Sequence, residues 1–568
     1  MPAGLPPSRF TEQIRARLLR ARTAGRQGAA VARILGRAGV IPALRPSTPV
    51  GLLRAVRRAV PGPHLALTLQ SKLRPHAPAV TDPDRRLSYG EFERESNQLA
   101  HALIALGVEP GDRVAMMLPN RAEFLIALAA LPRIGATAVQ IGYRLKGSEI
   151  AYIVENARPR VLIHDAAFTA EVDAARRAPD SHAPGPSHTI VVGGIDGDVA
   201  GLAYADTLGR QPGERAPARR SRDSGGIIIY TSGTTGRPKG ARRRFSQTGL
   251  VAVADLMEQV GMSQRDRHLI VCPLYHSGAS AFAMMMMTLG ASLVVIDHFE
   301  AEDVLALIER ERVTSAFMVP TMLVRLTALD PAVRARYDTS SLRWILSGAA
   351  PLPTETARRF QEAFGPILWN FYGATETGLV TLARPEDHTA HPGTVGRVLA
   401  GNELRILDEG GREQPTGEVG ELYVRSAMLI SEYHGDADAT RGAMRDGFFS
   451  VGDLARIDQA GHVYLASRVH DMVISGGVNI YPAEIEEHLH RHPDVLEAAV
   501  VGVPDDEWGE RLKAFVVARP GASLSPEEIV QFCREGLADF KRPREVVFVD
   551  TLPRNPTGKV LKRELRAM

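Results

Sequence analysis

The chain has 568 residues, of which 44% are hydrophobic, so it is too long for one compact core and has enough apolar content to bury two or more. The formal charge is +3 at pH 7, but positive charge is concentrated in the first 60 residues, where Glu12 is the only acid, so the remainder is net acidic and no nucleic acid is expected as a partner. Two cysteines exclude a disulfide framework, and the longest strongly apolar run, residues 281–296, falls short of the ~20 residues that span a bilayer, so the cytoplasm is the expected compartment.

Three short helices are the first elements expected along the chain, all in the basic arm. Apolar residues recur every three or four positions over residues 10–21, 31–38 and 52–59, and arginines take the other faces. Two interpretations stay open. Residues 1–60 could make a peripheral contact with an anionic membrane, or they could be a loosely packed extension whose arginines are solvated. An arginine-rich, acid-poor start also fits an organellar transit peptide.

Helical patterns then alternate with short apolar runs from about Leu87 to Ser467. This alternation predicts α/β layers built from crossover units. The runs expected to be strands are residues 113–118, 160–165, 189–194, 227–231, 292–297 and 315–320.

A second compact stretch follows Ser467. Strands are expected at residues 498–503 and 513–518, and a helix from Pro526 to Gly536. About 100 residues suffice for a small independent domain. The expected division is a basic helical extension at 1–65, a large domain at 66–467 and a small domain at 468–568.

The stretch from Tyr230 to Arg244, "YTSGTTGRPKGARRR", follows an expected strand directly. Its hydroxyls and glycine N–H groups can wrap a polyphosphate, while Lys239 adds positive charge. It is not a Walker A loop, because the glycines are spaced differently and Gly240 stands where the magnesium-binding hydroxyl is needed. Composition alone would equally fit a flexible surface loop.

The string "YTSGTTGRPKG" resembles the phosphate-loop signature of the adenylate-forming superfamily, which includes acyl-CoA synthetases, adenylation domains of peptide synthetases and luciferases. Further landmarks of that family follow in the same order. They are "SGAAPLP" at 347–353, "NFYGATETG" at 370–378, "FFSVGDLARID" at 448–458, "SRVHDMVISGGVNIYPAEIE" at 467–486 and "LPRNPTGKVLKREL" at 552–565. The resemblance therefore covers the chain from about Leu87 to the C-terminus. It implies an α/β fold, with a large N-terminal domain of several subdomains and a small, mobile C-terminal α+β domain.

The same resemblance implies a reaction in which ATP and Mg²⁺ activate a carboxylic acid as acyl-AMP, which is then transferred to CoA. It implies that Gly348, Ala349 and Ala350 wall the adenine slot, that Tyr372 stacks on the base, and that Asp453 and Arg468 hold the ribose. The residues implied to bind ATP or AMP are Thr231, Ser232, Gly233, Thr234, Thr235, Gly236, Lys239, Gly348, Ala349, Ala350, Asn370, Tyr372, Gly373, Asp453 and Arg468.

Four residues are implied to be catalytic. Lys559, in "PTGKV", would bridge the carboxylate and the α-phosphate, and Thr375 would contact the α-phosphate. Glu376 is the implied Mg²⁺ ligand, in an oxygen-rich site of the kind that Mg²⁺ prefers. His276 would gate the acyl pocket or contact the carboxylate end of the acid, although a histidine beside small residues also fits a satisfied core group. By contrast, the three arginines at 242–244 lie beyond the matched loop and are expected to form a solvated or inter-domain surface.

The second half-reaction is implied to need a rotation of the small domain. The family pivots at a residue that is commonly Asp or Lys, and here that position is His470, a departure that puts the hinge assignment in doubt. Gly476 and Gly477 resemble the strand that lines the pantetheine tunnel, where glycine permits close approach. The other residues implied to bind CoA are Trp508, Phe540 and Arg542, although the charged run at 539–544 also fits a solvated face.

The sequence leaves open which carboxylic acid is activated and which thiol accepts the acyl group. Residues 272–287, "CPLYHSGASAFAMMMM", resemble the family's acyl pocket, and methionine suits a flexible apolar ligand, which favours a medium- or long-chain fatty acid. "KGARRR" also resembles bacterial fatty acyl-CoA synthetases. The alternatives are an aryl-CoA ligase, an acyl-AMP ligase that loads a carrier protein, and a non-catalytic scaffold, against which the complete set of site residues argues. Chain length, pathway and oligomeric state are not encoded in these patterns.

Overall fold

The computed structural model of the protein describes residues 25–39, 64–178, 185–194, 201–217, 225–231, 238–244, 249–505, 507–555 and 559–568. Most of the expected phosphate loop, Ser232 to Gly236, lies outside these ranges, as do the helical patterns at 10–21 and 52–59. Within the described ranges, no helix is both long enough and apolar enough to cross a membrane.

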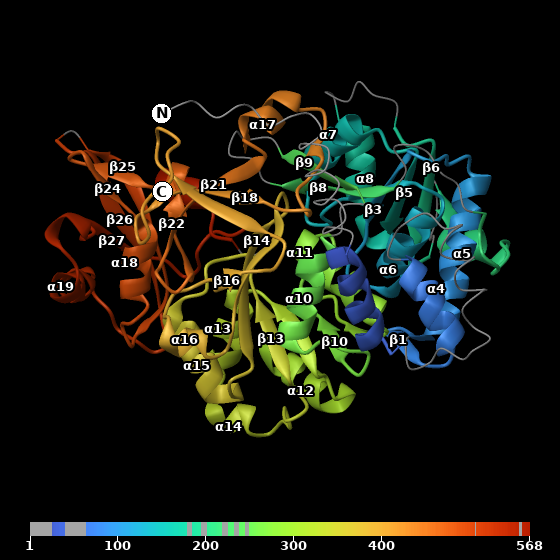
Figure 1. Ribbon diagram of the computed structural model, residues 1–568, viewed down its shortest axis with the longest axis horizontal. Helices are drawn as coiled ribbons and strands as arrows, with labels where there is room; N and C mark the ends of the chain where they lie inside the picture. The colour runs from blue at the N-terminus through green and yellow to red at the C-terminus, as the bar shows by residue number, and fades with distance from the viewer. Residues whose placement is uncertain are drawn as a thin grey trace, which may run out of the picture.

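Two large sheets, mostly parallel and flanked by helices, build the N-terminal part of the chain (Figure 1). The first has the order β19(Glu432–Tyr433), β9(Lys239–Arg244), β8(Gly226–Thr231), β4(Thr137–Gln140), β3(Arg113–Met117), β5(Val161–Asp165), β6(His188–Val192) and β7(Leu202–Ala203). The second has the order β16(Arg397–Val398), β15(Gly378–Ala383), β14(Leu368–Ala374), β13(Trp344–Ser347), β12(Ser315–Met318), β10(Arg267–Ile270), β11(Ser292–Val295), β1(Pro78–Thr81) and β2(Arg86–Ser88). All six strands expected from the apolar runs of this region are confirmed, as β3, β5, β6, β8, β11 and β12.

Helices connect the parallel strands and cover both sheets, as expected for crossover units. Their ends follow local rules: α5 begins with a capping box between Ser88 and Glu91. The helices of this region are α4(His64–Leu73), α5(Tyr89–Ala105), α6(Ala122–Ala130), α7(Gly147–Ala157), α8(Thr169–Arg176), α9(Tyr204–Gly209), α10(Leu250–Val260), α11(Ser277–Leu289), α12(Ala301–Glu311), α13(Pro320–Ala328), α14(Pro331–Arg334), α15(Thr354–Phe364), α16(Asp387–Ala390) and α17(Ala437–Gly442), with the short 3₁₀ turns η1(Leu131–Arg133) and η2(Ala166–Phe168). One continuous apolar core joins most of them to the second sheet.

A smaller antiparallel sheet follows, and it ends at the start of the small domain. Its strands are β17(Glu403–Leu407), β18(Gly420–Arg425), β21(Phe448–Ile457), β20(Met444–Arg445) and β22(Val463–Arg468). In the pairing of β21 with β22, Asp453 stands opposite Arg468. The pairing thus brings together two residues that are 15 positions apart in the sequence.

The C-terminal part has its own sheet and its own apolar cores. Its strands are β24(Val478–Ile480), β23(Val473–Ser475), β26(Gly509–Ala518), β25(Val495–Asp505) and β27(Glu545–Phe548), and its helices are α18(Pro482–Leu489), α19(Pro526–Gly536) and α20(Lys562–Ala567), with the turns η3(Val469–Asp471) and η4(Asp539–Lys541). Both expected strands and the expected helix are confirmed. The helix α19 has the predicted limits because Ser525 and Glu528 form a capping box and Pro526 occupies its first position. The mixed α/β fold with a large N-terminal and a small C-terminal domain is as expected.

One segment of the basic arm is a helix, over residues 25–37, that packs against the large domain. It is the dark blue helix beside α4, α10 and α11 in Figure 1. Ala30, Ile34 and Ala38 are buried, whereas Val31 is 39% exposed. Of the expected stripe of Val31, Leu35 and Ala38, only Ala38 is buried, and the other two buried positions each precede an expected one by one residue. In this segment the apolar face is covered by the protein's own large domain, and neither of the two open interpretations of the arm describes it.

Candidate functional site

A cavity of about 2290 Å³ lies where the large sheets, the helix α11 and the small domain meet. Thr375, Glu376 and His276 line it, together with Lys559 from the C-terminal end of the chain. The structure thus brings all four residues expected to be catalytic to one cavity. Such a volume exceeds the ~300–1,000 Å³ typical of a small-molecule pocket, so there is room for more than one ligand group.

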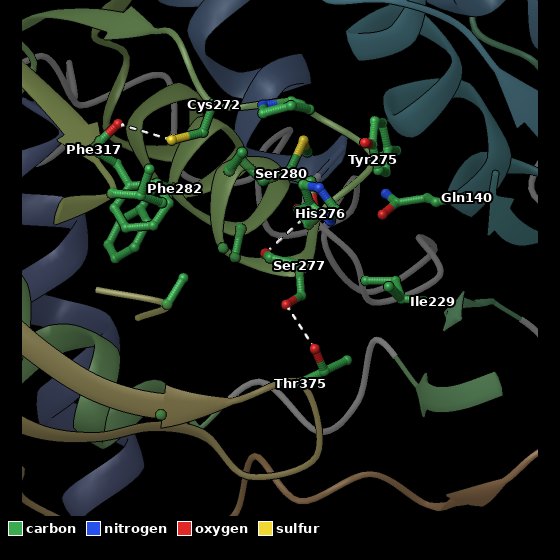
Figure 2. A pocket seen from close by; sticks show the side chains of 18 of the residues that line it. Gln140, Ile229, Cys272, Tyr275, His276, Ser277, Ser280, Phe282, Phe317 and Thr375 are labelled. Atoms are coloured by element: carbon green, nitrogen blue, oxygen red, sulfur yellow. Dashed lines mark hydrogen bonds between the residues drawn. The ribbon is translucent and has the colours of Figure 1, made fainter. Parts of the chain in front are cut away.

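The loop after β14 places Thr375 and Glu376. The Thr375 hydroxyl lies 3.0 Å from the Ser277 hydroxyl at the start of α11 (Figure 2). The Tyr433 hydroxyl donates to Glu376 Oε1 at 3.2 Å, and burial and this carboxylate raise the pKa of Tyr433. This end of the cavity therefore offers a carboxylate and several hydroxyl oxygens, the donor set that Mg²⁺ takes in preference to nitrogen or sulfur.

Arg243 supports the same loop, a role that the sequence did not predict. Its Nη2 donates to the Thr375 carbonyl oxygen at 2.6 Å, and it lines the cavity. Burial lowers the pKa of Arg243 to about 10, and the negative charge of Glu376 opposes that shift. Of the two alternatives expected for the arginines, the solvated surface is therefore wrong for Arg243, which connects β9 of the first sheet to the loop after β14 of the second. Strand alternation carried the signal, because Arg243 lies two residues from buried Ala241 on β9.

We expect Arg243→Met to slow adenylation by about 10- to 100-fold, because a charge-assisted hydrogen bond to a partly buried carbonyl is lost. Arg242→Met is the matched control, since Arg242 pairs with the half-exposed Glu432 at 2.9 Å. The measurement is acid-dependent release of pyrophosphate by both variants. Equal rates for the two would show that the contact with Thr375 does not position the loop.

Lys239 begins β9, directly after the segment of the phosphate loop that lies outside the described residues. Its Nζ lies 5.3 Å from the centroid of the Tyr433 ring and 3.8 Å from Asp436 Oδ2. It also lines the cavity, as does Arg244, whereas Thr231 at the end of β8 stands opposite Lys239 in the hairpin. The lysine is therefore on the same side of the cavity as Glu376, whose carboxylate Tyr433 contacts.

The expected ribose group is a compact polar cluster. Asp453 is 7% exposed, accepts a hydrogen bond from the Tyr372 hydroxyl at 2.6 Å and lies 3.1 Å from Arg468 Nε. Burial and the Asp453 carboxylate raise the pKa of Tyr372 well above its usual value. Both oxygens of the carboxylate are thus held in place. Because Arg468 lines the cavity, the cluster adjoins it.

Close packing explains the glycines at two of the positions expected to bind the nucleotide, Gly348 and Gly373. A Cβ on Gly348 would come within 2.4 Å of the Phe371 ring, and one on Gly373 within 2.1 Å of a backbone oxygen. Ala349 has φ = +69° and lines the cavity. Ala350 follows it in the chain, and Asn370 is buried in β14, beside Phe371. The three positions at 348–350 form the turn after β13.

Lys559 reaches the cavity from the small domain. Burial, and next the positive charge of Arg468, lower its pKa to about 8, while Asp453 and Asp471 oppose the shift. Its backbone N–H donates to Asn555 Oδ1 at 2.9 Å, which fixes the backbone position of the lysine. The small domain is thus oriented with its lysine toward the cavity that Thr375 and Arg468 line.

The residues expected to bind CoA lie elsewhere in this orientation. Gly476 lies beside Trp508, which is 52% exposed, and neither of them lines the cavity, nor does Gly477. Phe540 is 46% exposed, and Arg542 pairs with Asp539 at 2.8 Å, again away from the cavity. The structure therefore does not bring the expected CoA residues to the catalytic group.

His470 lies in η3, where the small domain starts, and it is exposed. Arg566, from the last helix, donates to its carbonyl oxygen at 3.1 Å and pairs with Asp471 at 3.0 Å. A rotation about this position would have to break that contact. The turn is therefore held by the C-terminal helix in this orientation.

Gln140 and Tyr275 are polar residues of the cavity that the sequence analysis missed. Gln140 is 2% exposed at the end of β4, and within the described chain neither its amide atoms nor the Tyr275 hydroxyl has a hydrogen-bond partner. Figure 2 shows both on the side of the pocket where His276 lies, and the rings of Tyr275 and His276 are 4.1 Å apart. The only sequence signal for Gln140 was a glutamine directly after the apolar pair Ala138 and Val139.

Comparison with known proteins agrees with this geometry. The model of the AMP-binding enzyme family matches residues 67–434, and that of the AMP-binding enzyme C-terminal domain matches residues 484–559. A long-chain-fatty-acid–CoA ligase, FadD13 of Mycobacterium tuberculosis, is 33% identical over 507 residues, which cover 88% of this chain and 97% of that protein. A feruloyl-CoA synthase of an Amycolatopsis species is 34% identical over 499 residues, with the same coverage. The crystal structure of the anthranilate CoA ligase AuaEII with anthranoyl-AMP has a TM-score of 0.82 at 29% identity and covers 90% of this chain and 98% of that one.

Proposed function

The chain belongs to the AMP-binding enzyme family of adenylate-forming acid–CoA ligases, and from that premise we propose that its acid is a medium- or long-chain fatty acid. The observation that carries this choice is the apolar cavity that leads from Thr375 along α11, where Met284 and Met285 line it. Methionine adapts to a flexible aliphatic chain better than to a rigid planar ligand.

The first half-reaction joins the carboxylate to the α-phosphate of ATP and releases pyrophosphate. Because a carboxylate repels nucleophiles, it must become a mixed anhydride before a thiol can attack it. Two anions have to approach each other, so the site must neutralise charge on both. Lys239 and the phosphate loop would hold the β- and γ-phosphates, while Thr375 would contact the α-phosphate.

Glu376 is the residue that would hold Mg²⁺. The fit rests on the oxygen donors around it, because the Tyr433 hydroxyl contacts its carboxylate and the Thr375 hydroxyl lies on the adjacent residue. A bound Mg²⁺ would supply positive charge to the phosphate oxygens. The buried guanidinium of Arg243 fixes the backbone from which the carboxylate projects.

The adenosine part of ATP would lie against the turn at 348–350, with its ribose hydroxyls on Asp453. In the structure the Tyr372 hydroxyl is bonded to Asp453, so we propose that Tyr372 orients this carboxylate as well as contacting the base. Arg468 completes the group from the opposite strand. Asn370 and Gly373, which lie on β14 with Tyr372, would also contribute to nucleotide binding.

The second half-reaction would use another orientation of the small domain. Lys559 lines the cavity in the structure, while Gly476, Gly477 and Trp508 lie away from it. We propose that the domain pivots at His470, releases Arg566 from the hinge carbonyl and brings the glycine turn to the cavity. Phe540 and Arg542 would then meet the nucleotide of CoA.

Assays of purified protein test the proposal. We expect ATP-, CoA- and acid-dependent formation of AMP, with octanoate and palmitate converted faster than benzoate. No turnover with any aliphatic acid longer than hexanoate would overturn the fatty acid assignment. Accumulation of acyl-AMP despite added CoA would instead identify a ligase that loads a carrier protein.

A polar or aryl acid is the second candidate, favoured by one specific observation. The Gln140 amide and the Tyr275 hydroxyl face the cavity without partners among the described residues, and buried polar groups normally find one. A hydroxyl or carbonyl group on the acid could satisfy them. Faster conversion of hydroxylated aryl acids than of palmitate would favour this candidate.

We also propose that the protein acts in the cytoplasm. Both cysteines, Cys272 and Cys533, are free and buried, which suits a reducing compartment. A peripheral membrane contact through residues 1–60 stays a proposal for the parts of the arm outside the described residues. Sedimentation with anionic liposomes, with and without the arm, measures it directly.

A further inference from the structure

We propose that the helix over residues 25–37 forms the outer wall of the acyl channel and, through Val31, Ile34 and Leu35, limits the length of the aliphatic chain that the protein accepts. The inference rests on the proposed fatty acyl-CoA synthetase function. It assigns a substrate-binding role to the basic arm, for which the sequence indicated only a membrane contact, a solvated extension or a targeting segment.

The cavity that contains Thr375 and His276 extends without interruption to the arm helix. Val31, Ile34 and Leu35 line the same 2290 Å³ as the catalytic residues. This volume exceeds the ~1,000 Å³ upper range of ordinary pockets, so it is more than a nucleotide and a small acid require.

Three helices line this part of the cavity mostly with apolar side chains, although Thr68 and Lys72 of α4 line it too. On α4, Leu65, Leu69 and Leu73 line it at a spacing of four residues, and on the arm helix Val31 and Leu35 do so at the same spacing. Residues four apart lie on one face of a helix, so each helix presents one side to the channel.

The third helix, α11, gives the length of the channel. It lines the cavity at Ser277, at Met284 and Met285, and at Thr288 near its C-terminal end. Thr288 lies eleven positions after Ser277, which corresponds to about 16 Å along the helix axis. That distance suits an extended aliphatic chain and far exceeds a single aromatic ring.

The wall is attached by specific polar contacts rather than by apolar packing alone. Arg33 pairs with Glu258 at 2.8 Å, and Arg37 donates to the Met262 carbonyl oxygen at 3.1 Å, at the end of α10. The fully buried amide of Gln70 donates to the carbonyl oxygens of Ala38, at 3.4 Å, and of Thr288, at 3.5 Å. Gln70 thus ties the end of the arm helix to the end of α11.

The arm helix lies outside the part of the chain that the family models match. The AMP-binding enzyme model matches from residue 67 onward, so the matched span includes most of α4 and all of α11 but not the arm helix. A wall contributed from outside that span can set chain length without any change in the catalytic residues.

Tryptophan substitution in the full-length protein tests the wall. Leu35→Trp would fill the channel, and Val31→Trp, at a half-exposed position, does so with little risk to folding. Ala32→Trp is the matched control, because Ala32 is exposed on the same helix and does not line the cavity. We expect the ratio of kcat/KM for palmitate to that for octanoate to fall at least about tenfold in both channel variants, because the last methylenes lose their apolar contacts. The control should keep the wild-type ratio.

A binding measurement separates this inference from the proposed function. A long-chain acid brominated near its methyl end should quench the fluorescence of the tryptophan introduced by Leu35→Trp or Val31→Trp, and it should leave that of the Ala32→Trp control unquenched. Quenching without turnover would retain the channel and reject the ligase activity. The proposed wall would be wrong if the wild type converted palmitate, all three variants kept the wild-type ratio of kcat/KM for palmitate to that for octanoate, and the brominated acid quenched none of the introduced tryptophans.

Discussion

Replacing Lys559 by alanine is expected to slow acid-dependent pyrophosphate release by about 10²–10³, while thioester formation from preformed acyl-AMP continues at close to the wild-type rate. The lysine lines the cavity with Thr375 and Glu376 in the observed orientation of the small domain. In the proposed mechanism its positive charge acts while the carboxylate and the α-phosphate approach each other. Once the acyl-AMP anhydride has formed, the small domain would rotate and carry Lys559 out of the cavity.

The pKa of Lys559 adds a pH dependence to that prediction. Burial, and next Arg468, lower the pKa to about 8, so in the free protein the ammonium loses its proton well below the pH at which an exposed lysine does. We expect kcat/KM for adenylation to fall as pH rises through about 8, since that ratio reports the free enzyme. Bound ATP adds negative charge near Lys559, so the corresponding decrease of kcat should occur at a higher pH than the decrease of kcat/KM. Arginine stays charged over this pH range, so a Lys559→Arg variant should not show the decrease in rate above about pH 8.

Stability measurements serve as the control for Lys559→Ala. A lysine with a lowered pKa in the folded state binds its proton more weakly there than in the unfolded chain, so its burial costs stability below pH 8 and the cost disappears as pH rises toward the unfolded value. Removing the lysine should therefore leave the free energy of unfolding at pH 7 unchanged or higher. Equal losses in both half-reactions, or a marked loss of stability, would contradict the assigned role.

The sequence predicted the frame of the fold well because the relevant signals are local. Apolar runs of the central strands, such as residues 113–118 and 315–320, need burial on both faces, which only a covered parallel sheet provides. The helix from Pro526 to Gly536 carries its own cap. The four residues expected to be catalytic were identified from strings of neighbouring residues, and the structure adds that they converge on one cavity.

The residues that sequence reasoning missed act through distant contacts. Arg243 appeared to belong to a solvated basic run, but the hairpin of β8 and β9 directs its side chain at Thr375, more than 130 positions away. Gln140 is a single polar residue beside the apolar pair Ala138 and Val139, and this pattern alone does not indicate that its side chain faces a cavity. The arm helix was recognised and Ala38 of its expected stripe is buried, but the other two positions were misplaced by one residue because Ala30 and Ile34 match the period as well as Val31 and Leu35 do.

Substituting Asp453 by alanine should raise the KM for ATP by about 10²-fold, and unlike Lys559→Ala it should impair both half-reactions. The carboxylate would hold the ribose of ATP in the first step and that of acyl-AMP in the second. Its removal also leaves the Tyr372 hydroxyl without its acceptor and Arg468 without its partner, at a cost of about 1–3 kcal/mol to the free energy of unfolding.

Asp453→Asn separates the ligand contact from the structural cost. The amide oxygen can still accept from the Tyr372 hydroxyl, so stability should largely return, but the charge that pairs with Arg468 is gone and an amide N–H replaces one acceptor for the ribose. Tyr372→Phe makes the converse change, since it keeps the carboxylate and removes only its buried donor. If Asp453→Asn regained stability and also bound ATP as the wild type does, the carboxylate would be a packing element and the ribose would lie elsewhere. If it regained stability but stayed defective in both half-reactions, the defect would follow the lost ribose acceptor, because both steps carry the same adenosine.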